Sequence, residues 1–268
     1  MRRRDLIGTA CMAGAGALAA TAGCALKTET RSEGGAGGTG GRELLELRIY
    51  KAENADVRGR LDKFLAEAAI PAWNRLGMKP VGVFALKDDS SPDLWVVQSH
   101  KSAECFITAQ SRLWADAEYQ KAAAFFDPPK AAPMYTRIEA NLLLTFEGAP
   151  KLQAQGDMKP DRIFQLRIYE SSCEERARLK LDMFNSAELD LFRKAGLTWV
   201  FFGQALAGTK MPNLTYMVGF PDEATQKAAW DAFGKSEGWK KLKDDPKYKD
   251  TVSNITNLIL KPTAYSQM

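Results

Sequence analysis

The amino-acid sequence predicts an α+β fold made of two consecutive β-α-β-β-α-β units. The first observation is a repeated tetrapeptide, "LRIY", which occurs at Leu47–Tyr50 and again 119 positions later at Leu166–Tyr169. The second observation is that Gly77 and Gly196, each closing a long amphipathic run, keep the same spacing. A strand motif and a helix end that recur at one interval exclude chance and indicate a duplicated structural unit.

The repeated strand is followed in each unit by an amphipathic helix. Apolar residues recur at intervals of three and four from Val57 to Leu76 and from Leu179 to Ala195, the spacing of a helix with one apolar stripe. Three local signals accompany these helices: Asn54 as the cap of the first, Ser172 with Glu175 as a capping box on the second, and Pro71 as a kink or restart in the first.

Two strand-like runs and a second helix complete each unit. The runs "VGVFALK" and "DLWVVQSH" in the first unit, and "WVFFGQAL" and "NLTYMVGF" in the second, are joined by turn residues as in a hairpin. The second helix is expected from Ser102 or Asp222 to about Phe126 or Leu242, followed by the closing strand "IEANLLLTF" or "ITNLILKP". This order defines a ferredoxin-like split βαβ unit.

One such unit covers only one face of its sheet with helices, so the other face needs a partner. A second unit in the same chain supplies it. The predicted architecture is therefore two tandem ferredoxin-like (βαββαβ) units, at residues 42–150 and 162–268, which bury each other's open face. The polar segment 151–161 is the expected linker between them.

Residues 1–23 have the composition of an export signal. Arg3 and Arg4, followed by Leu6–Ile7, fit the twin-arginine pattern, although an ordinary secretory signal is the alternative. "TAGC" resembles a lipoprotein box with Cys24 as the acylated residue, whereas "ATA" just before it suits plain cleavage. Residues 24–41 are rich in Gly, Ser and Thr and are expected to form a flexible tether. The predicted location is outside the cytoplasm, either periplasmic or anchored to the membrane as a lipoprotein.

The charge balance argues against a nucleic-acid partner. Once residues 1–41 are set aside, 32 basic and 30 acidic residues remain, with no basic stripe. Cys105 and Cys173 are too few for a disulfide framework and are either one bridge or two ordinary thiols. The tryptophans expected in the core are Trp73, Trp114, Trp199, Trp230 and Trp239.

Several motifs resemble the NIPSNAP family: "LELRIY", "FQLRIYE", "GLTWVFFGQALAGTKMPNLTYMVGFPD" and "AAWDAF". This family belongs to the dimeric α/β-barrel superfamily, which also holds antibiotic-biosynthesis-type monooxygenases and chlorite-dismutase-like haem proteins. The resemblance covers nearly all of residues 45–262 and is closer in the second unit, because "SAECFITAQSRLW" departs from the pattern in the first. It implies an intramolecular pseudo-dimeric α/β barrel, and it offers a cofactor-independent or haem-dependent oxidoreductase as an alternative function.

Strand alternation places the two halves of "LRIY" on opposite faces of the sheet. Leu47 and Ile49 are expected under the helices. The residues expected to face the interior between the two sheets, as candidate ligand-binding residues, are Arg48, Tyr50, Arg167 and Tyr169. They would line a cavity for an anionic or aromatic ligand, with Arg167 the better candidate because its unit keeps the family pattern. Alternatively, they pair with acids such as Glu46 and hold the two units together.

His100 is the single histidine and the remaining candidate for ligand binding. It is either an axial haem ligand or a surface residue at a strand end. No second histidine supports a protein-only metal site, and no catalytic triad or phosphate-binding loop is present. The sequence therefore predicts a small-ligand-binding or accessory protein with no evident cofactor. The expected partner is a small molecule or a protein, or a second copy in a homo-oligomer, with membrane contact only through the lipid anchor.

Overall fold

The computed structural model describes residues 41–127, 129, 132–155 and 161–268. The expected export signal, Cys24 and the tether up to residue 40 lie outside these residues, as do residues 156–160 of the expected linker. In the described part of the chain, no helix is both long enough and apolar enough to cross a membrane.

The first half of the fold alternates strands and helices in the expected order. Its elements are β1 (Leu44–Lys51), α1 (Ala55–Phe64), a π-helical turn (Leu65–Ala69), α2 (Ile70–Arg75), β2 (Gly82–Leu86), β3 (Leu94–His100), α3 (Ala103–Ala115), α4 (Ala117–Phe125) and β4 (Arg137–Thr145).

The second half repeats this order. Its elements are β5 (Ile163–Glu170), α5 (Glu174–Met183), a π-helical turn (Phe184–Glu188), α6 (Leu189–Lys194), β6 (Thr198–Ala207), β7 (Asn213–Phe220), α7 (Glu223–Lys235), α8 (Glu237–Lys243), a short 3-10 turn (Pro246–Tyr248) and β8 (Asn254–Pro262).

The helix ends follow the sequence signals with one exception. The Asn54 side chain accepts a hydrogen bond from the amide of Val57 and caps α1, as expected. Pro71 begins α2 after the π-helical turn. The capping box on the second helix was wrong: Cys173 is the N-cap of α5 without a side-chain bond.

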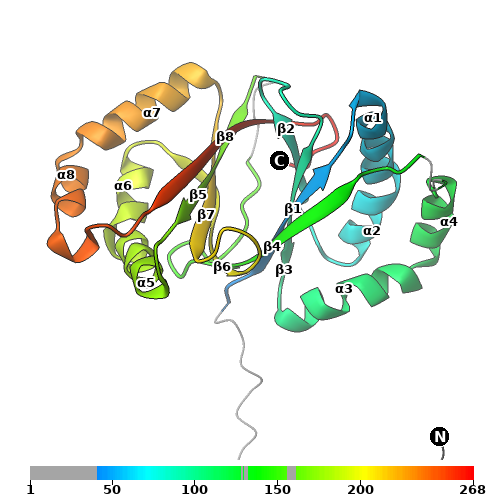
Figure 1. The fold of residues 1–268 in the computed structure, drawn as a ribbon, viewed down its shortest axis with the longest axis horizontal. Coiled ribbons are helices and arrows are strands. Elements are labelled where there is room, and N and C mark those ends of the chain that lie inside the picture. Colours follow the sequence, from blue (N-terminus) through cyan, green and yellow to red (C-terminus); the bar gives the residue numbers. More distant parts are fainter. Residues whose placement is uncertain (1–40, 128, 130–131, 156–160) are drawn as a thin grey trace, which may run out of the picture. The chain divides into compact units, whose positions relative to one another are not determined.

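Each expected second helix is two helices in the structure. Ser102 and Asp222 cap the first of each pair, α3 and α7, as the sequence indicates. The chain then breaks at Asp116 and Ser236, whose side chains cap α4 and α8. The helix direction changes at each break (Figure 1).

All eight strands pair antiparallel and close into one barrel, in the order β1-β3-β2-β8-β5-β7-β6-β4. Within each half this is the strand order of a ferredoxin-like unit. The halves join where β2 pairs with β8 and β4 pairs with β6, so each sheet's edge strands are covered by the other half (Figure 1). The α+β class and the pseudo-dimeric α/β barrel are confirmed.

The barrel interior is an apolar core to which both halves contribute. Its large side chains are Leu45, Leu47, Phe84, Trp95, Val97, Leu143, Phe164, Leu166, Val200, Phe201, Met217 and Leu260. Ile49 packs against this core, so both aliphatic residues of the first "LRIY" point inward. Arg48 and Tyr50 alternate to the outer face, which the helices cover.

The expected assignment of the two faces was therefore wrong. The inner face is closed by strands on every side, so it takes the aliphatic residues and leaves no place for a solvated charge. The helix-covered face keeps openings between the helices, and it tolerates the Arg and Tyr side chains. Tyr50 belongs to the core between sheet and helices in the first half, and Tyr169 to the equivalent core in the second.

Two smaller expectations have mixed outcomes. Trp73 is buried, but Trp114 is 55% exposed on α3, so its assignment to the core was wrong. Cys105 and Cys173 are both free thiols, with Cys105 in α3 of the first half and Cys173 before α5 of the second.

Candidate functional site

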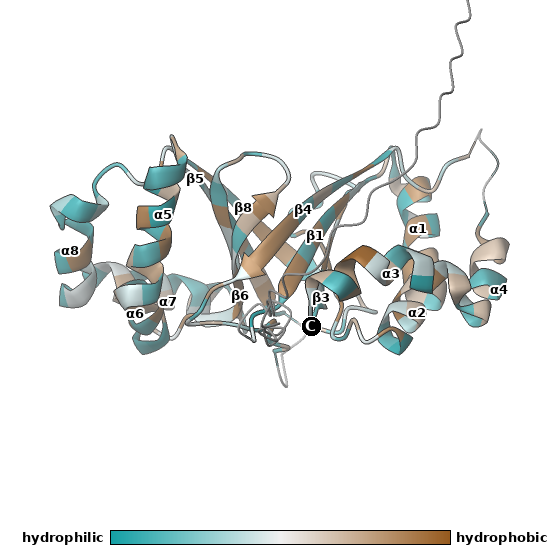
Figure 2. Cartoon of the chain, turned by 90° about the horizontal axis from the view of Figure 1, so that it is seen from below, coloured by the Kyte–Doolittle hydropathy of each residue, from teal (hydrophilic) through white to brown (hydrophobic). Residues whose placement is uncertain are grey.

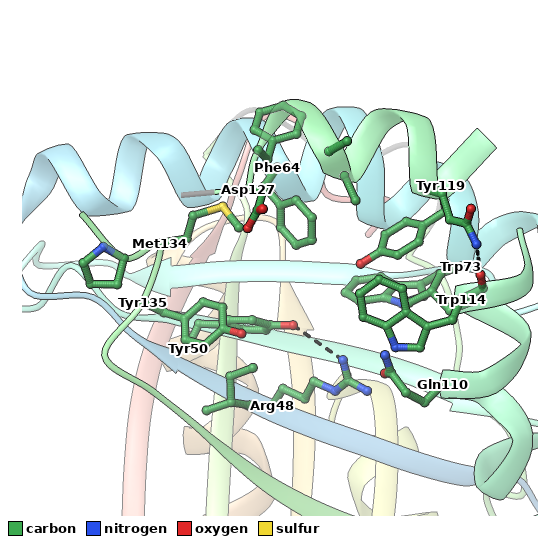
Figure 3. A pocket seen from close by; sticks show the side chains of 17 residues that line it. Arg48, Tyr50, Phe64, Trp73, Gln110, Trp114, Tyr119, Asp127, Met134 and Tyr135 are labelled. Carbon is green, nitrogen blue, oxygen red and sulfur yellow. Dashed lines mark hydrogen bonds between the residues drawn. The ribbon is translucent and has the colours of Figure 1, made fainter. Parts of the chain in front are cut away.

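A cavity of about 760 Å3 lies between the sheet and the helices of the first half. Figure 3 shows Arg48 and Tyr50 on the sheet side and Trp114 and Tyr119 on the helix side. The lining residues come from β1, β4, the helices α1 to α4 and the segment after α4: Arg48, Tyr50, Phe64, Trp73, Gln110, Leu113, Trp114, Tyr119, Gln120, Ala123, Ala124, Phe126, Asp127, Pro133, Met134, Tyr135 and Ile138.

Seven of the seventeen lining residues are aromatic. Tyr50 and Tyr135 meet edge to face with ring centroids 5.5 Å apart, and Trp114 and Tyr119 do so at 5.8 Å. Rings in such arrangements give a flat ligand both stacking and edge contacts. A pocket with many aromatic side chains and few polar groups is typical of a site for a small, largely apolar molecule.

Arg48 is the central polar group and is held in place by Glu46. Its Nε and Nη2 donate to the two carboxylate oxygens of Glu46 at 2.6 and 2.9 Å, a two-point contact that fixes the guanidinium plane. The remaining nitrogen, Nη1, lies 3.5 Å from the Tyr50 hydroxyl (Figure 3). The Arg48 guanidinium also lies 5.6 Å from the ring centroid of Trp73. One edge of the guanidinium therefore remains free to donate toward the cavity.

The pKa values of these groups keep the site in one protonation state. Burial raises the pKa of Glu46, but His100 and Arg48 lower it more, to about 2. Burial disfavours the charged form of Arg48, but Glu46 and Tyr50 raise its pKa above the ordinary value. Burial raises the pKa of the Tyr50 and Tyr119 phenols. At neutral pH the site therefore holds a charged Arg–Glu pair and two protonated phenols.

His100 lies near this pair but not in the cavity. Its side chain is 1% exposed, so its assignment as a surface residue was wrong. The ring packs edge-on against Phe106 at 5.2 Å, and Nε2 lies 3.5 Å from a carboxylate oxygen of Glu46. Gln98 donates to the same carboxylate at 3.0 Å. Gln98 thus holds the Glu46 carboxylate by a hydrogen bond, and the His100 ring lies beside it.

This arrangement does not fit a haem ligated by His100. An axial histidine must direct a ring nitrogen at the iron, in a space that holds the macrocycle. Here Nε2 faces Glu46, and His100 is not among the residues that line the cavity. Elsewhere in the described residues, no group of three or more His, Cys, Asp or Glu side chains is placed to hold a metal ion.

Glu46 should make folding sensitive to acid. Its pKa is about 2 in the folded state and near 4.5 in the unfolded chain, so its ionised form favours folding. This contribution is present above pH 4.5 and is lost as the pH falls toward 2. Glu46→Gln, which copies Gln165 of the second half, should remove this pH dependence and cost up to about 3 kcal/mol at pH 7.

Urea unfolding at pH 7, 4 and 3 measures this effect. Glu223→Gln, at an exposed ion pair with Lys87, is the matched control. Its free energy of unfolding should depend on pH as in the wild type. If the free energy of unfolding of Glu46→Gln depended on pH as in the wild type, the neighbours of Glu46 would not lower its pKa.

In the second half the equivalent arginine is covered by aromatic rings. The Arg167 guanidinium stacks on the rings of Tyr169 and Trp230, at 5.2 and 4.9 Å from their centroids. Trp230 Nε1 donates to Gln165 at 2.6 Å, which fixes the indole over the guanidinium. Arg167 and Tyr169 are not among the described residues that line the cavity. The expectation that all four "LRIY" residues share one cavity was therefore wrong, and the preference for Arg167 as the ligand candidate stays a prediction.

The difference arises at a single helix position. Gln110 and Trp230 are each the eighth residue of the equivalent helices α3 and α7. Gln110 lines the cavity, whereas Trp230 covers the arginine. Aligning the two units position by position would reveal this difference from the sequence, because one unit has Gln where the other has Trp.

The second half also buries an ion pair that the first half lacks. Lys180 Nζ lies 2.8 Å from Glu188, and their side chains are 5% and 2% exposed. Burial raises the pKa of Glu188 although Lys180 opposes it. The equivalent positions in the first half are Leu61 and Ala69, both apolar and buried. This space between sheet and helices is thus packed in the second half.

The fold and the site together define a class. One chain forms a closed barrel from two four-stranded antiparallel sheets, with helices on the outside of each and a ligand-sized cavity under one set. This is the dimeric α/β-barrel architecture, formed here within a single chain. Within it, residues 164–267 match the sequence model of the NIPSNAP family. The match lies in the second half, so a NIPSNAP-like first half remains a prediction from the internal repeat.

Two solved structures share the barrel fold at low identity, and a third matches one part of the chain. A protein from Fusobacterium nucleatum, provisionally named a monooxygenase, aligns with a TM-score of 0.57 and 8% identity over 82% of this chain and 92% of that chain. A similarly named protein from Lactobacillus acidophilus aligns with a TM-score of 0.55 and 8% identity over 82% of this chain and 94% of that chain. A NIPSNAP-like domain protein from Burkholderia xenovorans aligns with a TM-score of 0.37 and 16% identity over 40% of this chain and 90% of that chain. No curated protein matches the sequence. At 8% identity, the first two structures establish the fold alone.

Proposed function

We propose that the protein binds a small, flat, largely apolar molecule in the cavity of its first half. The observation that carries this proposal is the contrast between the halves. The first half leaves a space of about 760 Å3 with many aromatic side chains beside a guanidinium edge, whereas in the second half the Trp230 ring lies against the equivalent guanidinium. Packing alone does not explain this asymmetry, because the second half shows that the same framework accommodates a covered arginine.

The electrostatics favour an uncharged ligand with one hydrogen-bond acceptor. Glu46 neutralises Arg48, and the cavity wall also carries Asp127, so the net charge does not attract an anion. The free edge of Arg48 and the Tyr50 hydroxyl supply donors at one end of the cavity. A carbonyl, ether or hydroxyl oxygen on an aromatic ring would meet both the donors and the walls.

Binding is better supported than an oxidoreductase reaction. A cofactor-independent oxygenation begins by removing a proton from the substrate, which requires a base with a pKa near the working pH. Burial raises the pKa of Tyr50 and Tyr119, and the pKa of Glu46 is about 2, so none of these groups is tuned for that step. The names of the two barrel structures with similar folds suggest that chemistry, but the cavity residues do not.

The ligand proposal is tested by placing a tryptophan at the position where the second half has one. Gln110→Trp should weaken binding of the uncharged fluorophore 6-propionyl-2-dimethylaminonaphthalene, whose ketone is the acceptor, about tenfold or more, because the indole would occupy the ligand space. Fluorescence titration measures the dissociation constant of the fluorophore, and a ligand-dependent rise in melting temperature confirms binding to the folded state.

Ser111→Trp is the matched control for that titration. It adds the same side chain at the next position of α3, which is exposed and is not a lining residue. The control should bind the fluorophore like the wild type. Equal affinity in all three proteins, or no binding by the wild type, would refute the cavity as a ligand site.

We further propose that the protein acts outside the cytoplasm. The support is the sequence of residues 1–24, with Arg3 and Arg4 before a weakly apolar stretch and Cys24 at its end. Replacing both arginines with lysine should trap unprocessed precursor in the cytoplasm, visible as a larger species on a denaturing gel. Normal processing of that variant would argue for the ordinary secretory route.

A further inference from the structure

Three large apolar side chains are exposed on the helices that cover the cavity. Ile107 and Trp114 on α3 are 75% and 55% exposed, and Phe125 at the end of α4 is 84% exposed. Ile107 and Trp114 are seven residues apart and so lie on the same side of α3, two turns from each other. Figure 2 shows a brown, apolar stretch on α3 beside pale and teal ones. We call these three residues the rim face: helix spacing places Ile107 and Trp114 on one side of α3, and Phe125 is included because its neighbours on α4 line the same cavity.

The rim face adjoins the cavity. Trp114 belongs to both, since it lines the cavity wall while half of its side chain remains exposed. Phe125 lies between two lining residues in the sequence, Ala124 and Phe126, and its ring contacts that of Phe126 at 5.2 Å. Whatever covers the rim face would therefore also border the entrance to the cavity.

The fold does not require apolar residues at these positions. Ile107 and Trp114 correspond to Lys227 and Gly234 of α7 by their places in the two helices, and Phe125 corresponds to Asp245. The second half, with its covered arginine, therefore presents a polar surface from the same backbone. Exposed aromatic residues cost solubility, so their presence beside the open cavity indicates a contact with something apolar.

The charges around the rim face are mixed. Lys101 and Lys121 are exposed, and so are Glu104 and Glu118. Arg112 is engaged, because it donates to the Leu76 carbonyl at 3.1 Å. With opposite charges interspersed, the attraction of this face must come from its apolar side chains and should depend little on salt.

The place where the chain enters the barrel favours one occupant. Leu44, the first residue of β1, pairs with His100, and α3 begins three residues after His100. The chain before the barrel therefore starts at the end of the fold where α3 begins. The 17 residues that follow Cys24, up to Gly41, can span at most about 60 Å when fully extended. An acyl chain on Cys24 would thus hold α3 within reach of a bilayer surface.

We propose that the rim face docks on a lipid bilayer, with Ile107, Trp114 and Phe125 entering the interface between headgroups and acyl chains. Tryptophan and phenylalanine are suited to this region, because their rings are apolar and the indole keeps a hydrogen-bond donor. Docking places the cavity entrance at the lipid surface. It does not depend on a ligand in the cavity, so the two proposals can fail separately.

The test removes the acyl anchor and asks whether the rim face binds lipid by itself. The full chain carrying Cys24→Ala is mixed with phosphatidylcholine vesicles, and the bound fraction is measured by co-sedimentation at low and high salt. Adding Ile107→Lys and Phe125→Asp, which copies Lys227 and Asp245, should reduce the partition coefficient about tenfold or more. Both residues are exposed, so the melting temperature should stay the same.

A matched control carries Leu206→Lys and Met211→Asp. These exposed apolar residues, 46% and 47% accessible, lie in and after β6, away from the rim face. The control should bind vesicles like the Cys24→Ala chain. No vesicle binding, or equal loss in both variants, would overturn the proposal. So would a dimer in sedimentation velocity without lipid that only the rim variant dissociates, because the face would then bind a second copy.

Discussion

Residues 161–268 expressed alone should not fold as a soluble monomer. The fragment would expose the side of its sheet that faces the barrel interior, including Phe164, Phe201 and Met217, all fully buried in the intact protein. Each such side chain contributes about 1.5–3 kcal/mol when it is buried. The fragment would also leave β6 and β8 without the strands that pair with them, and unpaired edges favour association.

Size-exclusion chromatography with light scattering measures this outcome. We expect dimers or larger aggregates from the fragment alone. Co-expression with residues 41–155 should instead yield a soluble one-to-one complex, because the missing strands and core are restored. A folded, soluble monomer of the fragment would show that the second half does not need its partner.

Replacing Lys180 should cause the largest loss of stability among single substitutions at the buried ion pair. Lys180→Leu leaves Glu188 almost fully buried without the cation 2.8 Å away. An uncompensated buried charge of this kind costs about 3–5 kcal/mol. Lys180 also lies 4.7 Å from the ring centroid of Phe184, and that contact is lost as well. Chemical denaturation at pH 7 should show the loss.

The pH dependence and the double variant distinguish charge from packing. The pKa of Glu188 is raised by burial, so its neutral form favours folding, and this contribution is lost as the pH rises. Lys180→Leu should therefore be more destabilising at pH 7 than at pH 4. Adding Glu188→Ala copies Leu61 and Ala69 of the first half and should recover most of the loss, in contrast to two independent sites whose effects add. A double variant less stable than either single variant would contradict this account.

The fold was predictable because its signals are repeated. The strand motif, the helix spacing and the hairpins occur twice in register, and a half-covered sheet needs a second one. The assignment of the two sheet faces failed for a physical reason. Leu47 and Arg48 alternate, but alternation does not reveal which face is closed by strands and which lies under helices. Both faces are covered in this barrel, so the usual contrast between buried and exposed does not decide between them.

The candidate site was predicted in part. Arg48 and Tyr50 line a cavity, although it lies under the helices and not between the sheets. Glu46 pairs with Arg48 as expected, but both lie on β1, so this pair does not hold the two units together. The aromatic wall was missed, because residues such as Tyr119 reach the cavity only after the helix breaks at Asp116. A break of this kind follows from the capping side chain and its tertiary surroundings, and hydrophobic periodicity alone does not show it.

The closure of the barrel within a single chain has a consequence for how such a site can change. In a barrel assembled from two identical subunits, every substitution appears twice, so a tryptophan that fills one cavity fills both. Here Gln110 and Trp230 are encoded separately, as are Ile107 and Lys227. One half can therefore be optimised for rigidity while the other keeps an opening. Broken symmetry, rather than a new fold, separates the supporting half from the half with the cavity.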